Sequence, residues 1–167
     1  MKLGAPSSIE DGHDVSAFSC GHLALDDWLR RRALSNHKSG ASRTFVACVE
    51  NRVVAYYALA AGALACAEAT GRFRRNMPDP IPVAILARLA IDNGFQKRGL
   101  GRAMFRDAAL RILGAADVIG IRGLLVHAIS EEAASFYRAI GVESSPANPQ
   151  TLMVTLADLQ AALRGTG

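Results

Sequence analysis

The feature that most constrains this chain is the segment 83–113, where a strand pattern changes to a helix pattern across a loop containing glycine. The first part is an apolar, β-branched run of strand length, and Asp92-Asn93-Gly94 follows it with residues typical of turns. From Leu100 onward, apolar residues recur every four positions and charged residues fall on the opposite face. The apolar positions are Leu100, Met104, Ala108 and Ile112, and the charged ones are Arg102, Arg106, Asp107 and Arg111. The segment therefore predicts a strand, a glycine-rich loop and a helix.

The loop has the chemistry of a phosphate-binding site. The first N–H groups of a helix have no intrahelical acceptor, and the helix dipole places partial positive charge beside them. Gly99 and Gly101 leave room for an anion, and Lys97, Arg98 and Arg102 add full positive charges. The spacing matches neither the Walker loop nor the three-glycine dinucleotide fingerprint. Two glycines also occur in ordinary strand-to-helix turns, so this loop alone leaves both interpretations open.

Composition favours one globular domain. The chain has 167 residues, of which 50% are hydrophobic, and we expect a single domain over residues 1–167. No apolar run is long enough to cross a membrane and residues 1–4 do not begin a signal peptide, which predicts a cytoplasmic protein. Cys20, Cys48 and Cys66 are scattered without a C-x-x-C pair, so we expect no metal site. Cys48 and Cys66 lie in apolar segments and are predicted to be core thiols.

Positive charge is unevenly distributed along the chain. The formal net charge is +4, and most of the excess comes from 30–32, 72–75, Arg88 and 97–102. Clustered cations suit a polyanionic ligand. Each cluster is also compatible with an ordinary solvated face.

The remaining elements follow from periodicity and turn residues. We expect a helix over 25–36, an antiparallel hairpin of strands 44–50 and 53–61, and an ambiguous segment over 63–75. Three prolines make 76–82 irregular. A strand over 123–129, a helix capped by Ser130 and ending before Gly141, a strand over 151–155 and a helix over 156–163 complete the chain. This order predicts an α/β fold of mixed type, with one mixed sheet and helices on its faces.

These motifs together resemble the GNAT acetyltransferases, whose signature is Q/R-x-x-G-x-G/A. Gln96, Gly99 and Gly101 match that signature after a strand, and Phe136-Tyr137 lies in the Ser-capped helix. The stretches ALDDWLRRRAL, GASRTFVAC, GRFRRNMPDPIPV and SEEAASFYRAIG are similar to the GNAT toxins of bacterial toxin–antitoxin pairs. The resemblance covers most of the chain and implies the GNAT fold, a mostly antiparallel twisted sheet with helices on both faces.

The resemblance also implies a reaction and its partners. The donor would be acetyl-CoA, with its diphosphate at 97–102 and its pantetheine arm paired like an added strand beside 89–91. The acceptor would be the α-amino group of aminoacyl-tRNA, so translation would be blocked, and a ribbon-helix-helix antitoxin would neutralise the protein. A homodimer is common in this subfamily. The implied cofactor-binding residues are Leu89, Ala90, Ile91, Gln96, Lys97, Arg98, Gly99, Leu100, Gly101, Arg102, Ser130 and Phe136.

Tyr137 is the candidate catalytic residue, a general acid that delivers a proton to the CoA sulfur. A backbone N–H in 89–91 would polarise the thioester carbonyl. An α-amino group has a pKa near 7.7–8.0, well below lysine at about 10.4, so the acceptor needs little help from a base. Accordingly, His127 is interpreted as a strand residue and Asp92 as a turn former. Alternatively, Tyr137 is a core residue at the edge of a buried stripe formed by Phe136 and Ile140.

Arginines are the candidates for contact with the tRNA acceptor stem. Arg74, Arg75 and Arg88 are the main ones, with Lys38 and Arg32 as weaker candidates. Two other functions stay open from the sequence. One is a GNAT enzyme that acetylates a small amine or a protein N-terminus. The other is a module that binds CoA or nucleic acid without catalysis.

Overall fold

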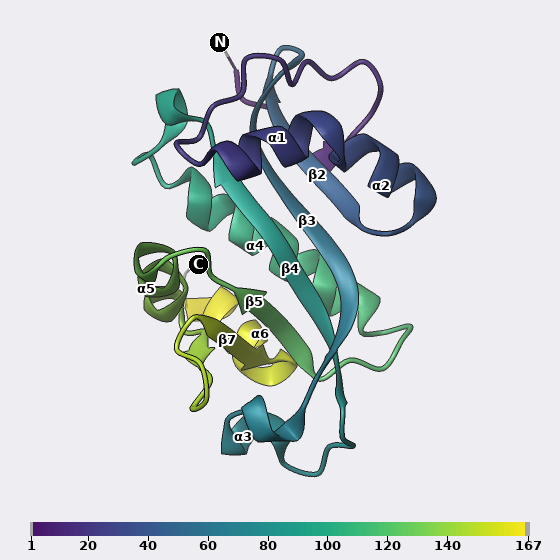
Figure 1. Ribbon diagram of the computed structural model, residues 1–167, viewed down its shortest axis with the longest axis vertical. Helices are drawn as coiled ribbons and strands as arrows, with labels where there is room; N and C mark the ends of the chain where they lie inside the picture. The colour runs from purple at the N-terminus through teal and green to yellow at the C-terminus, as the bar shows by residue number, and fades with distance from the viewer. Residues whose placement is uncertain (1, 166–167) are drawn as a thin grey trace. The chain divides into compact units, whose positions relative to one another are not determined.

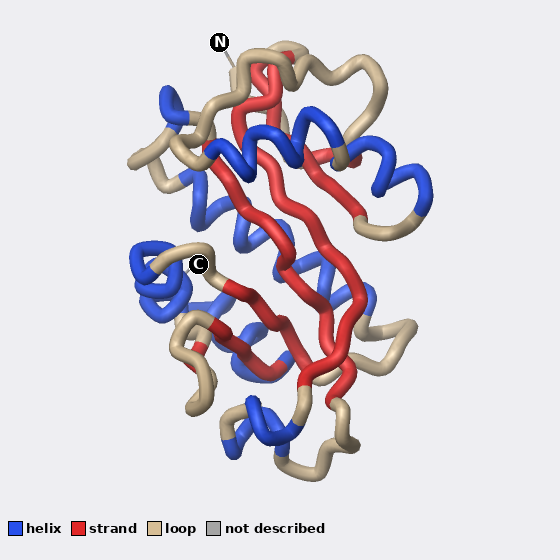
Figure 2. The backbone as a smooth tube through the Cα atoms, in the orientation of Figure 1, coloured by secondary structure: helices blue, strands red, loops and turns tan. Residues whose placement is uncertain are grey.

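The computed structural model describes residues 2–165, in which strands alternate with helices (Figures 1 and 2). In chain order the elements, including the short 3₁₀ helices η1 and η2, are β1 (Ser7–Ser8), α1 (Leu23–Arg31), α2 (Ala33–Ser39), β2 (Arg43–Val49), β3 (Arg52–Leu64), η1 (Cys66–Glu68), α3 (Gly71–Arg74), β4 (Ile81–Ile91), η2 (Asn93–Phe95), α4 (Leu100–Ala115), β5 (Gly123–His127), α5 (Glu131–Ile140), β6 (Glu143–Ser144), β7 (Thr151–Thr155) and α6 (Leu156–Gly165).

Hydrogen bonding orders the strands of the described residues as β1-β2-β3-β4-β5-β7-β6. The β4–β5 pair is parallel, whereas β1–β2, β2–β3, β5–β7 and β6–β7 are antiparallel. The predicted mixed, mostly antiparallel sheet is therefore confirmed. The chain divides into two compact units, the first Met1–Ala60 with Ala87–Ala108 and the second Ala61–Leu86 with Ala109–Gly167. Strands β3 and β4 and helix α4 each contribute residues to both units.

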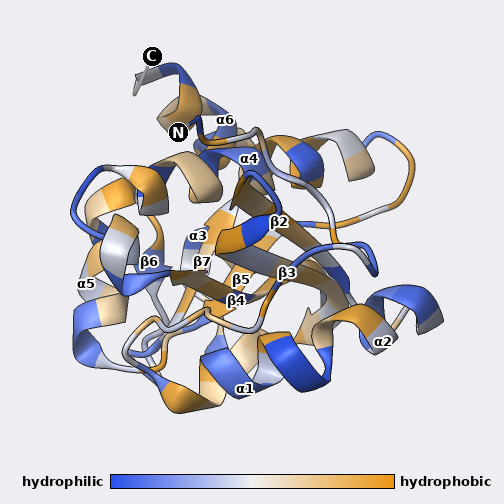
Figure 3. Ribbon diagram, turned by 90° about the horizontal axis from the view of Figure 1, so that it is seen from above, coloured by the Kyte–Doolittle hydropathy of each residue, from blue (hydrophilic) through white to orange (hydrophobic). Residues whose placement is uncertain are grey.

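The first unit has helices on both faces of its strands. Helices α1 and α2 lie on one face and the beginning of α4 on the other (Figures 1 and 3). Phe18, Leu29, Val46 and Tyr56 belong to its buried cluster, and the Tyr56 hydroxyl donates to the Leu25 carbonyl at 2.7 Å. Burial of these aromatic and branched side chains removes apolar surface from water and so stabilises the unit.

The helix predicted over 25–36 is interrupted. Arg32 has φ −124° and ψ −31° and separates α1 from α2, although its N–H still donates to the Trp28 carbonyl at 2.8 Å. No glycine or proline marks this break, so local sequence did not indicate it. Leu29 is buried in the cluster of this unit, and Trp28 and Leu34 pack against it.

In the second unit, β4 runs parallel to β5 with Ala84 opposite Leu124 and Leu86 opposite Val126. Helix α5 contacts β6 and β7, and α6 contacts β5 and β7. At Gly123 a Cβ atom would lie 2.0 Å from the Val154 carbonyl oxygen, so only glycine allows β5 and β7 to approach this closely.

The ambiguous segment 63–75 resolves into three pieces: the end of β3, η1 and α3. The Thr70 hydroxyl caps α3 by accepting from the Phe73 N–H at 3.2 Å, and the Phe73 ring packs in the core with Ile81 and Leu125. The prediction that 76–82 is irregular was wrong at its end, because β4 begins at Ile81. The ladder to β5 begins only at Ala84, so Pro82 is not required to donate a hydrogen bond to it.

Two further predictions need correction. Cys48 and Cys66 are half-buried, while Cys20 is the buried thiol, because the first two pack only against the margins of their clusters. The strand over 123–129 ends at His127. Strands β1 and β6 have two residues each, too few to leave a periodic pattern. Within the described residues no helix is long and apolar enough to span a bilayer.

Candidate active site

The turn after β4 is organised by the buried carboxylate of Asp92, which is 4% exposed. One oxygen accepts the Gly94 N–H at 3.0 Å and the other accepts the Ser19 N–H at 3.1 Å. Arg52 lies 3.5 Å away and compensates the charge. The interpretation of Asp92 as a turn former is confirmed, and the residue also fastens the turn to the N-terminal segment.

Gln96 fastens the next part of the loop. Its side-chain nitrogen lies 2.9 Å from both the Cys20 and the Ile91 carbonyl oxygens and 3.3 Å from Asn93 Oδ1. Because these acceptors engage the amide nitrogen, the side chain positions the loop relative to the end of β4. The motif predicted Gln96 at this place, but its partner Cys20 is distant in sequence and could not be predicted.

The loop backbone then turns into α4 through left-handed conformations. Lys97 has φ +63° and Gly99 has φ +79°, and a Cβ atom at Gly99 would meet nothing within 4 Å. The Ala103 N–H donates to the Gly99 carbonyl at 3.1 Å. The N–H groups of 100–102 therefore come before the first N–H that has an intrahelical acceptor, at the positive end of a helix of 16 residues. This geometry is that of an anion-binding cradle.

Exposed cations surround the cradle. The side chains of Lys97, Arg98 and Arg102 are exposed. The Arg98 guanidinium lies over the Phe95 ring, 5.4 Å from its centroid. This cation–π contact restricts the position of the Arg98 side chain. No binding role was assigned to Phe95 from the sequence, and its contact with Arg98 exists only in the folded loop.

The end of β4 offers backbone groups beside this loop. The parallel ladder with β5 ends at Leu86 and Val126, so 89–91 lie beyond it. Ala90 is buried in the core of the first unit, while Leu89 and Ile91 are half-buried. Backbone N–H and C=O groups of this kind can pair with an extended ligand as an added strand would.

Helix α5 is closed at both ends by local interactions that the sequence predicted. The Ser130 hydroxyl accepts the Ala133 N–H at 3.1 Å, and Glu131 and Glu132 occupy the first turn. Gly141 ends the helix with φ +114°. The caps fix the position of the aromatic pair in the second half of the helix.

Tyr137 is buried, with 6% of its surface exposed. Burial raises the pKa of its hydroxyl, which stays protonated throughout the physiological range. The Phe136 ring meets it edge-on at 5.1 Å and is half-buried. The alternative buried stripe of Phe136 and Ile140 was wrong, because Ala134 and Tyr137 are the buried residues of α5.

Comparison with known proteins identifies the family. Residues 40–143 match the acetyltransferase (GNAT) domain. The chain belongs to the GNAT acetyltransferases. The chain is 52% identical over 159 residues to the tRNA-acetylating toxin of Mycobacterium tuberculosis (strain ATCC 25618 / H37Rv), covering 95% of this chain and 96% of that protein.

Solved structures of GNAT toxins are also similar. AtaT complexed with acetyl-methionyl-tRNAfMet has a TM-score of 0.87 and 26% identity, with 96% of this chain and 98% of that chain covered. A Tyr-to-Phe variant of the toxin AtaT, bound to the C-terminus of the antitoxin AtaR and acetyl-CoA, has a TM-score of 0.81 and 25% identity, with 96% and 97% covered.

In this GNAT chain the predicted tRNA-contacting arginines have different environments. Arg74 and Arg75 are exposed at the end of α3 in the second unit. Arg88, in the first unit, is half-buried with its guanidinium 4.4 Å from the centroid of the Trp28 ring. Lys38 forms an ion pair with Asp11 at 2.9 Å, and Arg32 is exposed between α1 and α2.

His127 and Asp92, the two residues considered from the sequence as possible general bases, have structural surroundings. His127 is exposed at the end of β5, and its Nδ1 lies 3.2 Å from the Thr151 hydroxyl. Its interpretation as a strand residue is confirmed. Asp92 is engaged by two N–H groups and Arg52. Across residues 2–165, no three His, Cys, Asp or Glu side chains are grouped so that they could hold a metal ion.

Proposed function

We propose that this protein is a toxin that transfers the acetyl group of acetyl-CoA to the α-amino group of aminoacyl-tRNA and thereby blocks translation. The observation that carries this proposal is the 52% identity, along 95% of the chain, to a tRNA-acetylating toxin. The cradle at the start of α4 supports it, because exposed N–H groups at a helix N-terminus suit the diphosphate of CoA.

The chain provides donors for each part of the cofactor. The N–H groups of Leu100, Gly101 and Arg102 bind the diphosphate, and the space beside Gly99 admits it. The side chains of Lys97 and Arg98 add positive charge. Gln96 holds the loop backbone, Ser130 caps α5, and Phe136 packs against the Tyr137 ring. Leu89, Ala90 and Ile91 pair with the pantetheine arm, and one of their N–H groups polarises the thioester carbonyl. Acetyl-CoA supplies the activated acetyl group.

Tyr137 serves as the general acid. Its hydroxyl donates the proton that the CoA sulfur takes up as the bond to the acetyl carbon breaks. Burial supports this role, since it raises the pKa of the phenol and keeps the proton available. The acceptor α-amino group needs no strong base, because a pKa of about 7.7–8.0 or lower leaves roughly a tenth or more of it neutral at pH 7.

The tRNA is held by arginines, with Arg74, Arg75 and Arg88 as the proposed contacts. Guanidinium groups suit phosphates because they donate in a planar fork. Arg88 also stacks on Trp28, which fixes its direction before tRNA binds.

We further propose that the two compact units act as one domain over residues 1–167. The protein works in the cytoplasm, where its substrate is, as a homodimer neutralised by a ribbon-helix-helix antitoxin. The structure of AtaT bound to the C-terminus of the antitoxin AtaR supports an antitoxin segment as the partner.

The decisive experiment incubates the protein with labelled acetyl-CoA and bulk charged tRNA, and identifies the acetylated aminoacyl species by mass spectrometry. We expect label on the α-amino group of one or more aminoacyl-tRNAs and none on uncharged tRNA. Acetylation of polyamines or N-terminal peptides, with charged tRNA untouched, would instead establish an ordinary small-amine or N-terminal acetyltransferase.

A further inference from the structure

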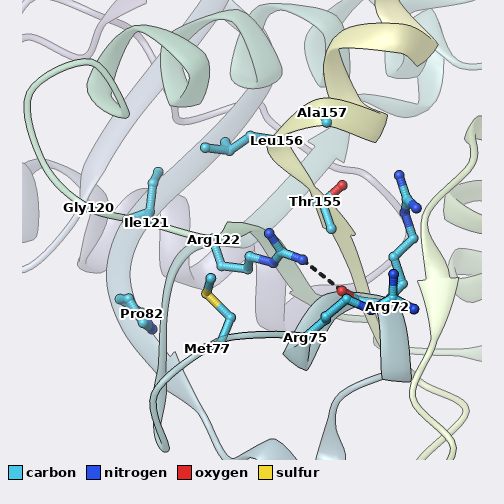
Figure 4. A pocket seen from close by; sticks show the side chains of 10 residues that line it. All are labelled: Arg72, Arg75, Met77, Pro82, Gly120, Ile121, Arg122, Thr155, Leu156 and Ala157. Atoms are coloured by element: carbon cyan, nitrogen blue, oxygen red, sulfur yellow. Dashed lines mark hydrogen bonds between the residues drawn. The ribbon is translucent and has the colours of Figure 1, made fainter.

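The second unit contains a cavity of about 550 Å³ whose wall includes three arginines, Arg72, Arg75 and Arg122 (Figure 4). Met77, Ile121 and Leu156 supply apolar wall, and no lining residue is acidic. The volume lies within the range of about 300–1,000 Å³ that is usual for small-ligand sites. Positive charge and apolar surface in one hollow suit an organic phosphate.

Arg122 is held rigidly in this wall. Its backbone N–H donates to the Pro82 carbonyl at 2.8 Å, and its carbonyl accepts from the Leu156 N–H at 3.1 Å. Its guanidinium donates to the Phe73 carbonyl at 2.8 Å and to the Arg72 carbonyl at 2.7 Å, the second bond being drawn in Figure 4. These bonds use two of the five guanidinium N–H groups of this half-buried residue, which leaves three.

The other two arginines differ in how far their charge is compensated. Arg72 makes a two-point ion pair with Asp158, at 2.5 and 2.7 Å, and this contact lowers the pKa of Asp158. Arg75 is exposed, and its side chain makes no hydrogen bond or ion pair with the described residues. Arg75 therefore presents an uncompensated charge to the cavity, and Arg72 is largely satisfied. Arg122 is intermediate, because its charge also lowers the pKa of Asp158, less than Arg72 does.

From this geometry we infer that the cavity binds a nucleotide phosphate of the RNA substrate, between Arg75 and Arg122, with the sugar or base against the apolar wall. The inference rests on the proposed function and adds Arg122 to the RNA-binding residues. A guanidinium already fixed by two carbonyls loses little conformational freedom on binding, which favours it over a mobile surface arginine.

The test measures binding of a 5′-phosphorylated RNA hairpin carrying an acceptor stem and of AMP, by fluorescence anisotropy and calorimetry. Arg75→Glu is compared with Arg164→Glu, the same charge change at an exposed site on α6 outside the cavity. We expect Arg75→Glu to raise the Kd for the hairpin about tenfold or more and Arg164→Glu to raise it less than twofold. Arg122→Lys, at the residue that this inference adds, keeps the charge and loses the fork, and should raise the Kd by an amount between these two.

The outcomes separate the possible sources of the phosphate. Loss of hairpin binding in Arg75→Glu supports an RNA phosphate, whereas loss of AMP binding with hairpin binding intact overturns the inference and assigns the site to a free nucleotide. Equal effects of Arg75→Glu and Arg164→Glu on both probes would overturn the inference. Failure of the wild-type protein to acetylate charged tRNA is a different result that overturns the proposed function. If both hold, Arg75→Glu raises KM for charged tRNA and leaves kcat unchanged.

Discussion

Tyr137 shows how burial of one side chain prepares it for a chemical role. The phenol lies 6% exposed on a helix capped at both ends, with Phe136 packed against its ring. Removal from water disfavours the phenolate, so the hydroxyl keeps its proton until the pH is well above neutral. A proton donor in a proposed acyl transfer needs this property, and a core tyrosine would have it too. Only kinetics separates the two roles.

We expect Tyr137→Phe to lower kcat by about 10² or more, with little change in KM for acetyl-CoA, because proton donation matters only in the transition state. The matched control is Tyr56→Phe, which removes a buried hydroxyl bonded to the Leu25 carbonyl at 2.7 Å. That variant should lose about 1 kcal/mol of stability and keep its kcat. Steady-state kinetics and thermal melts measure both. Equal kcat values for Tyr137→Phe and wild type would leave Tyr137 a core residue.

The pH dependence of kcat/KM follows from the same side chain. We expect the rate to rise with pH as the acceptor amine loses its proton, and then to level off. The raised pKa of Tyr137 places any loss of its proton above the ordinary value of 10, so no falling limb should occur below that pH. A decline between pH 8 and pH 9 in the acetylation of charged tRNA would indicate another acid.

At the scale of elements, the loop between β4 and α4 is shaped before any ligand arrives. Asp92 and Gln96 hold the turn through N–H groups and carbonyls of the first unit. Lys97 and Gly99 adopt positive φ, which directs the chain into α4. The cradle is therefore preorganised. The loop loses its conformational entropy when the chain folds, and not when the ligand binds.

Gln96→Met tests that preorganisation, because methionine has a similar size and donates no hydrogen bond. We expect the Kd for acetyl-CoA, measured by calorimetry, to rise about tenfold as the loop loses its bonds to Cys20 and Ile91. Gln160→Met, at an exposed position of α6, is the control and should leave the Kd unchanged. If both variants bind alike, the hydrogen bonds of Gln96 do not shape the cradle.

Two glycines beside and within α4 should respond oppositely to alanine. At Gly99 the φ of +79° strains any side chain although space is open, so Gly99→Ala should cost about 1 kcal/mol and weaken acetyl-CoA binding. At Gly114 space is open and φ is not in the left-handed range, so Gly114→Ala should stabilise by about 0.5–1 kcal/mol. Chemical denaturation measures both changes. Stabilisation by Gly99→Ala would contradict the left-handed conformation.

At the scale of the whole molecule, positive charge is spread over both units. The net charge is +4, but the positive residues are concentrated in 72–75, in 97–102 and at Arg88. Cations so arranged attract a polyanion from a distance and select weakly among sequences. Recognition of the aminoacyl group must then come from contacts near the acceptor end of the tRNA.

Binding of charged tRNA should therefore depend strongly on salt. Raising NaCl from about 50 to 200 mM should increase KM for charged tRNA at least tenfold, since each phosphate contact releases counterions. The KM for acetyl-CoA should change less, because its phosphates are fewer. Kinetics at several salt concentrations, plotted on logarithmic axes, give the slope. A slope near zero for tRNA would exclude a binding mode dominated by arginine and phosphate.

Much of the fold could be read from local patterns. The strand, loop and helix of 83–113 were predicted because hydrophobic period and turn residues act over a few neighbouring positions. Strand 151–155 was predicted with its observed bounds, and the caps at Ser130 and Gly141 were identified correctly. The break at Arg32 and the two-residue strands were missed, because they arise from packing and leave no mark in composition.

The residue types of the candidate site were also predicted from the sequence: glycines and cations in the loop, and an aromatic pair in a helix. Their partners were decided by folding, because contacts such as Gln96 to Cys20 and Arg122 to Phe73 join residues far apart in sequence. The burial that raises the pKa of Tyr137 and the cavity beside Arg75 also depend on surfaces brought together from several elements. Local sequence specifies periods and caps, whereas desolvation and long-range hydrogen bonds exist only once the chain has packed.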